Sequence, residues 1–253
     1  KCMRGKLKTA GKGYQPAEVL AHLHGEDSAR DWPGADWPVY QNYVDAIRYG
    51  QVDRYLANSF IYAVLITAAQ LLFNVLAAYA FARMHFAGRD LLFTLLLSTM
   101  MVPPAVLLVP NFMVVRDLGL VDTLWGILLP GFAGAFGVFL LRQAFLNIPA
   151  ELEQAARIDG CGSWGILLNV ILPLSKPALI TLGLFTFMGS WNMFEWPLVV
   201  LSNQDYYPLT VGLSFFRAET SSDWPRIFAA SVMGAAPLIA LLLLAQRYLV
   251  GGI

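Results

Sequence analysis

Ten residues between two long apolar runs, ELEQAARIDG, have side chains whose types and spacing point to a specific role. They have the chemistry of a short surface helix. Asn147 is a possible cap, and Pro149 stands near the first turn, where the missing N–H of a proline is tolerated. Glu151 and Glu153 lie where the positive end of the helix dipole favours acids. Gly160 is a natural stop, so we predict that the helix ends there.

Small side chains form one face of this predicted helix. The residues that recur at three- and four-residue steps are Leu152, Ala155, Ala156 and Asp159. After the glycine, SWGILLNVILPLSKPAL begins a second helix with Ser163 as its expected cap and breaks at Pro173 and Pro177. We therefore expect two short helices that are joined at a glycine and lie at a membrane surface. An ordinary interfacial hairpin would have the same pattern.

A second group of polar residues lies in the stretch GSWNMFEWPLVV. Asn192 and Glu195 are three residues apart, which predicts that they share a helix face. An ionisable group within a membrane span is costly, so Glu195, Asn192 and Trp191 form a candidate substrate path. The alternative is a position near the outer interface, where Trp191 and Trp196 would be belt residues. The sequence favours neither interpretation over the other.

The sequence offers no arrangement for catalysis, metal binding or cofactor binding, so we expect a chain that is not an enzyme. The stretch Gly5–Gly13 resembles a phosphate loop, but its spacing is too long and Gly13 stands where Ser or Thr is required. Cys2 and Cys161 lack metal-ligand or disulfide spacing. The three histidines, His22, His24 and His85, are too few and too scattered for a metal site; His22 and His24 could form a weak two-ligand pair, but a solvated polar segment is the favoured interpretation. A formal net charge of zero gives no reason to expect a nucleic-acid partner.

The elements that must position these residues are membrane helices. The chain is 57% apolar and only 13% charged, whereas soluble domains carry about 25% charged residues. A helix needs about 20 apolar residues to cross the hydrocarbon core. The uncharged runs predict five spans, at residues 58–82, 91–115, 123–145, 178–200 and 227–248. The predicted fold class is an all-α membrane protein, a polytopic helical bundle.

Prolines, glycines and amides distinguish the first three spans. The second contains Pro103, Pro104 and Pro110, which remove backbone donors and predict a kink or break. The third has small residues at three-residue steps, which predicts close helix packing. These residues are Gly131, Gly134 and Gly137. In the first span, Gln70 and Asn74 are one turn apart and are expected to form hydrogen bonds between helices.

The distribution of Lys and Arg gives an orientation. If the first visible span runs inward, more of these residues fall in the short inner regions than in the outer loops. We therefore expect residues 1–54 to be an extracytoplasmic segment with a short helix near Val39–Tyr49. Residues 55–250 then form a transmembrane domain, and its loop 146–177, which holds ELEQAARIDG, faces the cytoplasm.

The spacing within this loop closely resembles the EAA motif of ABC-importer permeases. That motif has two alanines, three residues, a glycine, nine residues and an Ile-x-Leu-Pro ending. Here the pair Ala155–Ala156 precedes Gly160, and VILP follows at 170–173. Gln154 stands at the motif's glutamate and Val170 at its isoleucine. The neutral amide keeps size and some hydrogen bonding, but it has no charge for a salt bridge.

Other stretches, including AAYAFARMHFAGRD, LPLSKPAL and FMGSWNMFEWPLVVLS, are similar to the carbohydrate-uptake branch of this family, which includes maltose and glycerol-phosphate permeases. The resemblance implies a type I importer permease with six spans, so a sixth is expected upstream of Lys1. It implies one half of the translocation pathway of an ATP-driven, binding-protein-dependent importer, most directly for a sugar. A polyol or glycerol phosphate is the nearer alternative, and an ATP-independent secondary transporter is the more distant one.

The resemblance also implies partners in the inner membrane of a prokaryotic cell. They are a second, different permease, two cytoplasmic ATPase subunits that hold ATP and Mg, and an extracytoplasmic sugar-binding protein. In this family the motif's helix sits in a cleft of the ATPase and transmits its closure to the spans. The residues with this implied coupling role are Glu151, Glu153, Gln154, Ala155, Ala156, Arg157, Asp159, Gly160 and Pro173.

Overall fold

A computed structural model describes residues 39–219 and 224–250 of the chain. The predictions for the phosphate-loop-like stretch, for the first two histidines and Cys2, and for most of segment 1–54 lie outside these residues. The chain divides into two compact units, Lys1–Asn42 and Tyr43–Ile253. The helices from residue 52 onward all belong to the second unit.

One helix dominates this unit. Helix α4 (Val52–Arg83) has 32 residues and is, among the described residues, the one helix that is long and apolar enough by itself to cross a membrane. It contains the first predicted span. A shorter helix, α3 (Val39–Gly50), precedes it at the position where the sequence predicted one. The far end of α4, at Arg83, is called the Arg83 end below, and the near end is called the Val52 end.

The second and third predicted spans are broken. Helices α5 (Arg89–Thr99) and α6 (Pro104–Asp117) meet at an angle of 103°. Pro103 precedes the first residue of α6, and a proline there cannot donate the hydrogen bond that would continue α5. Pro110 lies inside α6, which continues through it. If each sharply bent pair of helices counts as one span, the described residues contain up to four spans.

The remaining helices are shorter, and no strand occurs within the described ranges. In chain order they are α7 (Leu124–Leu128), η2 (Leu129–Gly131), α8 (Ala135–Leu146), α9 (Ala150–Ile158), α10 (Ser163–Ile166), the π-helical turn η3 (Leu167–Ile171), α11 (Leu172–Leu174), α12 (Lys176–Trp191), α13 (Glu195–Val200), η4 (Gln204–Tyr206), α14 (Leu209–Glu219) and α15 (Trp224–Val250). The fourth predicted span is therefore divided between α12 and α13. The fifth lies in α15, whose described apolar stretch is Ile227–Leu243.

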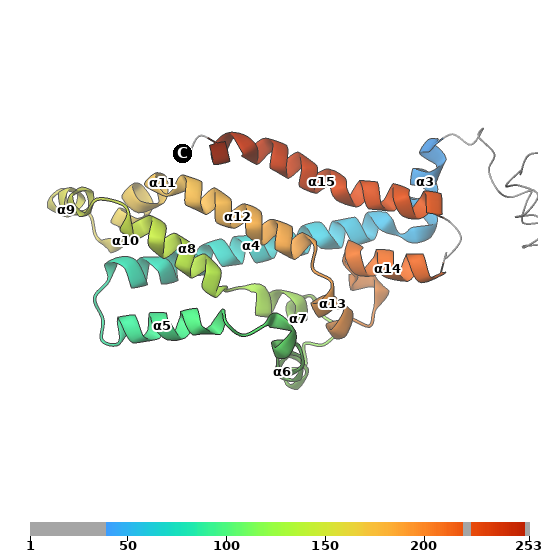
Figure 1. Ribbon diagram of the computed structural model, residues 1–253, viewed down its shortest axis with the longest axis horizontal. Coiled ribbons are helices and arrows are strands. Elements are labelled where there is room, and N and C mark those ends of the chain that lie inside the picture. The colour runs from blue at the N-terminus through green and yellow to red at the C-terminus, as the bar shows by residue number, and fades with distance from the viewer. Residues whose placement is uncertain (1–38, 220–223, 251–253) are drawn as a thin grey trace, which may run out of the picture. The chain divides into compact units, whose positions relative to one another are not determined.

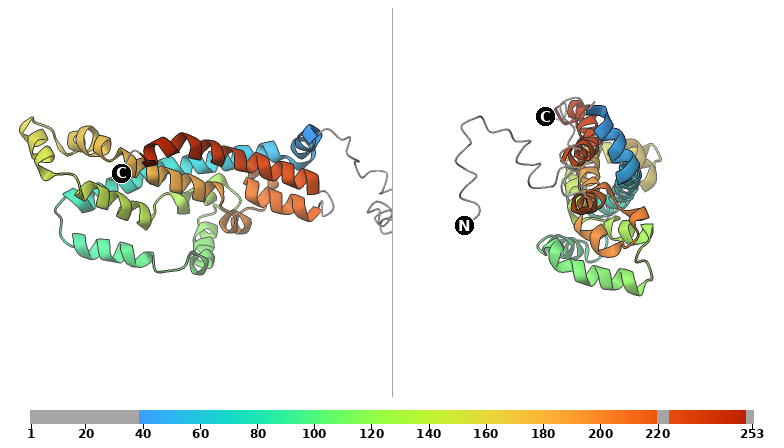
Figure 2. Two further views of the ribbon diagram at one scale, coloured as in Figure 1. Left: turned by 45° about the horizontal axis from the view of Figure 1, so that its top comes forward. Right: turned by 90° about the vertical axis from the view of Figure 1, so that its right-hand side faces the viewer.

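Helix α4 packs against both α8 and α12, which also contact each other, and α15 lies against α12 (Figures 1 and 2). The predicted glycine face makes this close approach possible. A Cβ atom on Gly131 would lie 3.2 Å from Ile66, and one on Gly137 would lie 2.1 Å from Asn74 Nδ2. Any larger residue at Gly137 would push α8 away from α4. The packing interpretation of these glycines is confirmed.

The break between η2 and α8 is held by two amide side chains of α4. Gln70 Nε2 donates to the carbonyl of Gly131 at 2.8 Å, and the backbone N–H of Gly134 donates to Asn74 Oδ1 at 3.3 Å. Thr186 of α12 donates its hydroxyl to Gln70 Oε1 at 3.2 Å. Irregular backbone at membrane depth needs such partners because lipid offers none. The predicted interhelical bonds of Gln70 and Asn74 are confirmed.

Candidate functional site

The predicted surface helix is α9, and it lies beside the Arg83 end of α4 (Figure 1). It begins at Ala150, with Pro149 in the capping position and Glu151 and Glu153 in the first turn. The predicted cap Asn147 is wrong, because that residue instead ends α8. The predicted cap Ser163 is also wrong by one position: it is the first residue of α10, after Gly162.

Helix α9 ends in a Schellman motif. The N–H of Cys161 donates to the carbonyl of Ala156 at 2.9 Å, and the N–H of Gly160 donates to the carbonyl of Arg157 at 3.1 Å. These bonds satisfy carbonyls that the end of a helix leaves without donors. Gly160 has a φ of +87°, which is a left-handed conformation that favours glycine. The helix therefore ends where the sequence predicted.

The face of α9 that packs against the other helices is only partly the small-residue face. Its buried residues are Glu153 and Ala156, whereas Leu152, Ala155 and Asp159 of the predicted small-residue face are exposed. Ala156 packs in an apolar core with side chains from several other helical segments. That core includes Val75, Ala78, Phe145, Ile148, Ile166 and Leu167. The helix is turned toward Glu153 because a buried carboxylate must lie beside its charged partner.

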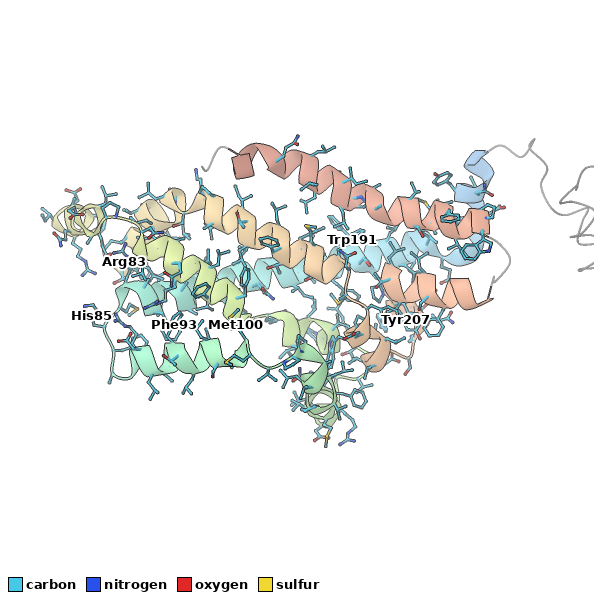
Figure 3. The ribbon with its side chains drawn as sticks, in the orientation of Figure 1. Arg83, His85, Phe93, Met100, Trp191 and Tyr207 are labelled. Carbon is cyan, nitrogen blue, oxygen red and sulfur yellow. The ribbon has the colours of Figure 1, made fainter. Side chains whose placement is uncertain are left out.

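That partner is Arg83, the last residue of α4. Its Nε lies 3.7 Å from Glu153 Oε2, and the two side chains are only 11% and 10% exposed. Arg157, one turn further along α9, donates to Glu153 Oε1 at 2.9 Å from a more exposed position. One buried carboxylate thus faces two guanidinium groups. Figure 3 shows Arg83 at the end of α4 that lies next to α9.

Arg83 also holds the end of α8. Its Nη2 donates to the carbonyls of Phe145 and Ile148, both at 2.6 Å. One turn earlier in α4, the Tyr79 hydroxyl donates to the carbonyl of Ser163 at 3.2 Å. The last turn of α4 therefore contacts both arms of the α9–α10 hairpin. Sequence reasoning missed Arg83 and Tyr79, although the arginine that ends the first uncharged run was a visible signal.

The outward face of the hairpin carries exposed apolar side chains. Ile158 is 87% exposed and Trp164 is 66% exposed, with Leu152 at 44%. Gln154, which occupies the motif's glutamate position, is also exposed. Pro173 is exposed near the start of α11. A polar helix that is fixed on one face and apolar at its exposed tip is suited to contact with another protein.

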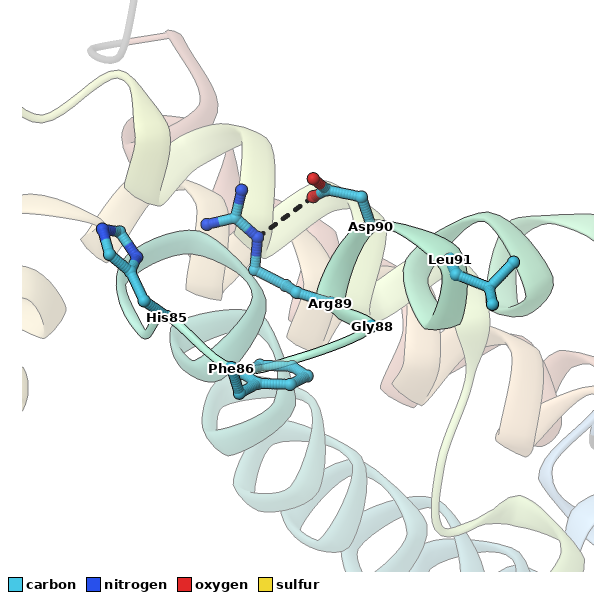
Figure 4. Close-up of a pocket in the computed structure, with 6 residues that line it drawn as sticks. All are labelled: His85, Phe86, Gly88, Arg89, Asp90 and Leu91. Atoms are coloured by element: carbon cyan, nitrogen blue, oxygen red, sulfur yellow. Dashed lines mark hydrogen bonds and ion pairs between the residues drawn. The ribbon is translucent and has the colours of Figure 1, made fainter.

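The turn from α4 to α5 lies at the same end of the unit. It forms a surface hollow of about 420 Å³ lined by His85, Phe86, Gly88, Arg89, Asp90 and Leu91 (Figure 4). Arg89 is paired within it to Asp90 at 3.0 Å. Close by, Arg142 of α8 lies 4.0 Å over the ring of Phe93 and donates to the carbonyl of Phe81 at 3.2 Å. These contacts fix the start of α5 against α4 and α8.

The candidate substrate path is not one continuous face. Trp191 ends α12 and is buried, where it stacks on Phe187 and donates to the carbonyl of Gly234 at 3.2 Å. Asn192 is exposed and donates back to the carbonyl of Met188 at 2.8 Å. Glu195 is exposed and begins α13. The predicted shared helix face is wrong, because α12 ends at Trp191 and Glu195 begins a different helix.

Trp196 provides the remaining test of the belt interpretation. Its indole N–H donates to the carbonyl of Gly126 at 3.1 Å, and its ring is partly buried against the core at the Val52 end. Both tryptophans therefore join helices within this unit. Neither has the exposed ring that a belt residue would turn toward lipid.

Residues 70–250 match the family described as binding-protein-dependent transport system inner membrane component. Among curated relatives, a probable ABC transporter permease protein, YurM of Bacillus subtilis, is 35% identical over 84% of this chain and 71% of its own. The arabinooligosaccharides permease protein AraQ of Halalkalibacterium halodurans is 36% identical over 79% and 71%. The sn-glycerol-3-phosphate permease protein UgpE of Brucella abortus is 33% identical over 85% and 79%.

Solved structures agree with these sequence relationships. One chain of a bacterial ABC transporter involved in the import of the acidic polysaccharide alginate is 31% identical, with a TM-score of 0.73 over 82% of this chain and 78% of that one. A chain from a second alginate transporter structure is 14% identical, with a TM-score of 0.65 over 92% of both, and supports the fold. The chain belongs to the family of binding-protein-dependent transport system inner membrane components.

Proposed function

We propose that this chain is one of two permease subunits of an ATP-driven importer of a sugar. A second, different permease completes the pathway, and an extracytoplasmic binding protein delivers the sugar. Two cytoplasmic ATPase subunits bind ATP and Mg, and α9 docks on one of them. The chain itself carries out no chemical step, since its part is to move helices when the ATPase closes.

The observation that carries this proposal is the division of α9 into two faces. Glu153 and Ala156 are buried against the membrane helices, while Ile158 is 87% exposed. An isolated exposed isoleucine is common on protein surfaces, but here it is joined by Leu152 and Trp164 on one hairpin. A second protein that covers this apolar surface would gain free energy by removing it from water.

The proposed orientation follows from α9. If α9 contacts a cytoplasmic ATPase, the Arg83 end of α4 is cytoplasmic and the Val52 end is extracytoplasmic. The N-terminal segment then lies outside. The proposed spans are the five that the uncharged runs predict and one more upstream. This agrees with the excess of Lys and Arg that the positive-inside rule requires in short inner regions.

The proposed substrate class is supported by relatives whose names refer to arabinooligosaccharides and alginate. Relatives named for sn-glycerol 3-phosphate favour the second candidate, in which the same machinery imports that solute. The two candidates differ in the chemical class of the solute, because glycerol 3-phosphate is a phosphate ester without a sugar ring. The two are distinguished by measuring how strongly each solute of a panel competes for uptake, with neutral oligosaccharides, alginate fragments and glycerol phosphate in the panel.

The test is reconstitution of the complete transporter in proteoliposomes with Ile158→Asp. A charge at this exposed position should lower ATPase co-purification and binding-protein-stimulated ATP hydrolysis at least about tenfold, because it would be buried at the interface. Tyr206→Asp, at an exposed side chain near the Val52 end, is the matched control and should leave ATPase co-purification unchanged. Uptake by the wild-type chain without ATP or an ATPase partner would overturn the proposal and favour a secondary transporter.

A further inference from the structure

We propose that the ion pair of Arg83 with Glu153 is the link through which a movement of α9 displaces α4 and α8. Both side chains are then positioning residues for transport. The inference rests on the proposed function, in which α9 receives its movement from an ATPase. It goes further because it names the contact that passes the movement from the docking helix to the membrane helices.

The first support is that one guanidinium group contacts three elements. Arg83 belongs to α4, donates to the carbonyls of Phe145 and Ile148 at the end of α8, and faces Glu153 of α9. The last carbonyls of a helix carry partial negative charge and need donors. The planar fork of an arginine can serve these carbonyls and a carboxylate together, which a lysine ammonium cannot do in the same geometry.

The second support is the burial of the pair. Exposed ion pairs contribute little to the free energy of folding, because water readily hydrates the two charges when they separate. Glu153 is a buried carboxylate, so a movement that separated it from Arg83 would leave it with only the more exposed Arg157 as a charged partner, which costs free energy. The carboxylate therefore moves with the guanidinium. A buried pair adds little net stability over an apolar replacement, and its main consequence here is to fix the register of α9 on α4.

The third support is a donor that the arrangement leaves without an acceptor. Arg83 Nε is buried and makes no hydrogen bond among the described residues. Its 3.7 Å separation from Glu153 Oε2 is longer than a hydrogen bond of about 3 Å. A small approach of α9 toward α4 would convert this ion pair into a hydrogen-bonded one. The contact can therefore tighten when α9 is pressed toward the membrane helices.

A fourth observation distinguishes the ion pair from the other contacts that hold the hairpin against α4. Tyr79 holds the other arm of the hairpin by a neutral hydrogen bond to the carbonyl of Ser163. The two contacts lie one turn apart on the same face of α4. Because the two arms are held separately, the charge of Glu153 can be removed while Tyr79 and the Ala156 core still hold the hairpin in place.

The experiment uses the complete transporter in proteoliposomes with Glu153→Gln, which keeps the size of the side chain and removes its charge. We expect ATPase co-purification to stay at the wild-type level, while uptake per ATP hydrolysed falls about tenfold. Glu153→Asp, which keeps the charge at a shorter reach, should restore part of this loss. Arg83→Lys, which keeps the charge but loses the fork, should show the same uncoupling as Glu153→Gln.

The matched control is Arg116→Gln, which removes an arginine from the exposed pair with Asp117 and should couple normally. Wild-type coupling in both Glu153→Gln and Arg83→Lys would overturn the proposed link. Loss of ATPase co-purification in these variants would also overturn it, since the pair would then only maintain the docking surface. Failure of the wild-type chain to retain an ATPase would instead reject the proposed function.

Discussion

The two ends of α4 hold their neighbours by different chemistry. At the Arg83 end, buried charges join three helices, with Arg83 and Glu153 only 11% and 10% exposed. At the Val52 end, the ion pair of Arg54 with Asp205 is 50% exposed on both sides. The loop between α13 and α14 is held there mainly by neutral groups, because Tyr62 and Asn58 donate to the carbonyls of Tyr206 and Tyr207 at 2.8 and 3.0 Å.

This difference has a mechanical consequence. Neutral hydrogen bonds to loop carbonyls fix one loop to one helix, and the carboxylate of Asp122, in the loop between α6 and α7, accepts in addition from the N–H groups of Ser202 and Asn203. A buried charge shared among α4, α8 and α9 instead ties the positions of those elements to one another. The Val52 end is thus built to stay in place, whereas the Arg83 end is built so that its elements move together.

The largest expected effect is that of Arg83→Ala. It leaves Glu153 buried beside only the half-exposed Arg157 and removes the donors for two carbonyls, so the free energy of unfolding should fall by about 3–5 kcal/mol. The decrease in apparent melting temperature in mild detergent measures this loss of stability. Arg54→Ala at the Val52 end is the matched variant. Equal losses in the two variants would remove the distinction between the two ends.

A smaller loss is expected from Gly212→Ala, which tests apolar packing at the Val52 end. The added Cβ would lie 2.2 Å from the buried ring of Tyr55, so either the ring or α14 must shift. Overpacking of this kind costs about 1–3 kcal/mol. The same melting measurement detects it. A variant as stable as wild type would show that this core is loose enough to adjust.

Gly160→Ala should cost about 1 kcal/mol, because its left-handed backbone disfavours a side chain although no atom lies within 4 Å of the added Cβ. Gly162→Ala also has open space but no positive φ, and it should be neutral. The difference in melting temperature between these two variants isolates the conformational cost. Equal values would mean that α9 does not need its left-handed stop.

The smallest effect is expected from Asp205→Asn. The exposed pair with Arg54 contributes at most about 1 kcal/mol, and salt screens it. Melting temperatures at low and high ionic strength should converge for this variant and wild type as salt rises. A loss comparable to that of Arg83→Ala, insensitive to salt, would contradict the assignment of weak electrostatics to the Val52 end.

Much of the fold follows from local sequence, because each predicted feature depended on neighbours in the chain. The long uncharged run became α4, the glycine steps became the α4–α8 contact, and Gly160 ended α9. The amides Gln70 and Asn74 were identified by the cost of polar groups within a span. These features need no knowledge of which helices are neighbours.

The inaccuracies concern partners that are distant in the chain. The small residues of α9 did not indicate which residues face inward, and that face is set by Glu153, whose partner Arg83 lies at the end of a different helix. Asn192 and Glu195 were assigned to one helix face from their spacing, yet α12 ends at Trp191 and Glu195 begins α13. Periodicity describes an uninterrupted helix, and it gives no account of a break or of the neighbour that stabilises it.

The docking role of α9 is tested most directly by a photoactivatable crosslinking residue at position 158 in the complete transporter. We expect a covalent adduct with the ATPase subunit, and no ATPase adduct when the same residue is placed at position 206 in the loop at the Val52 end. Adducts at position 158 with lipid or with the binding protein, and none with the ATPase, would contradict the central claim that the outward face of α9 is the ATPase contact.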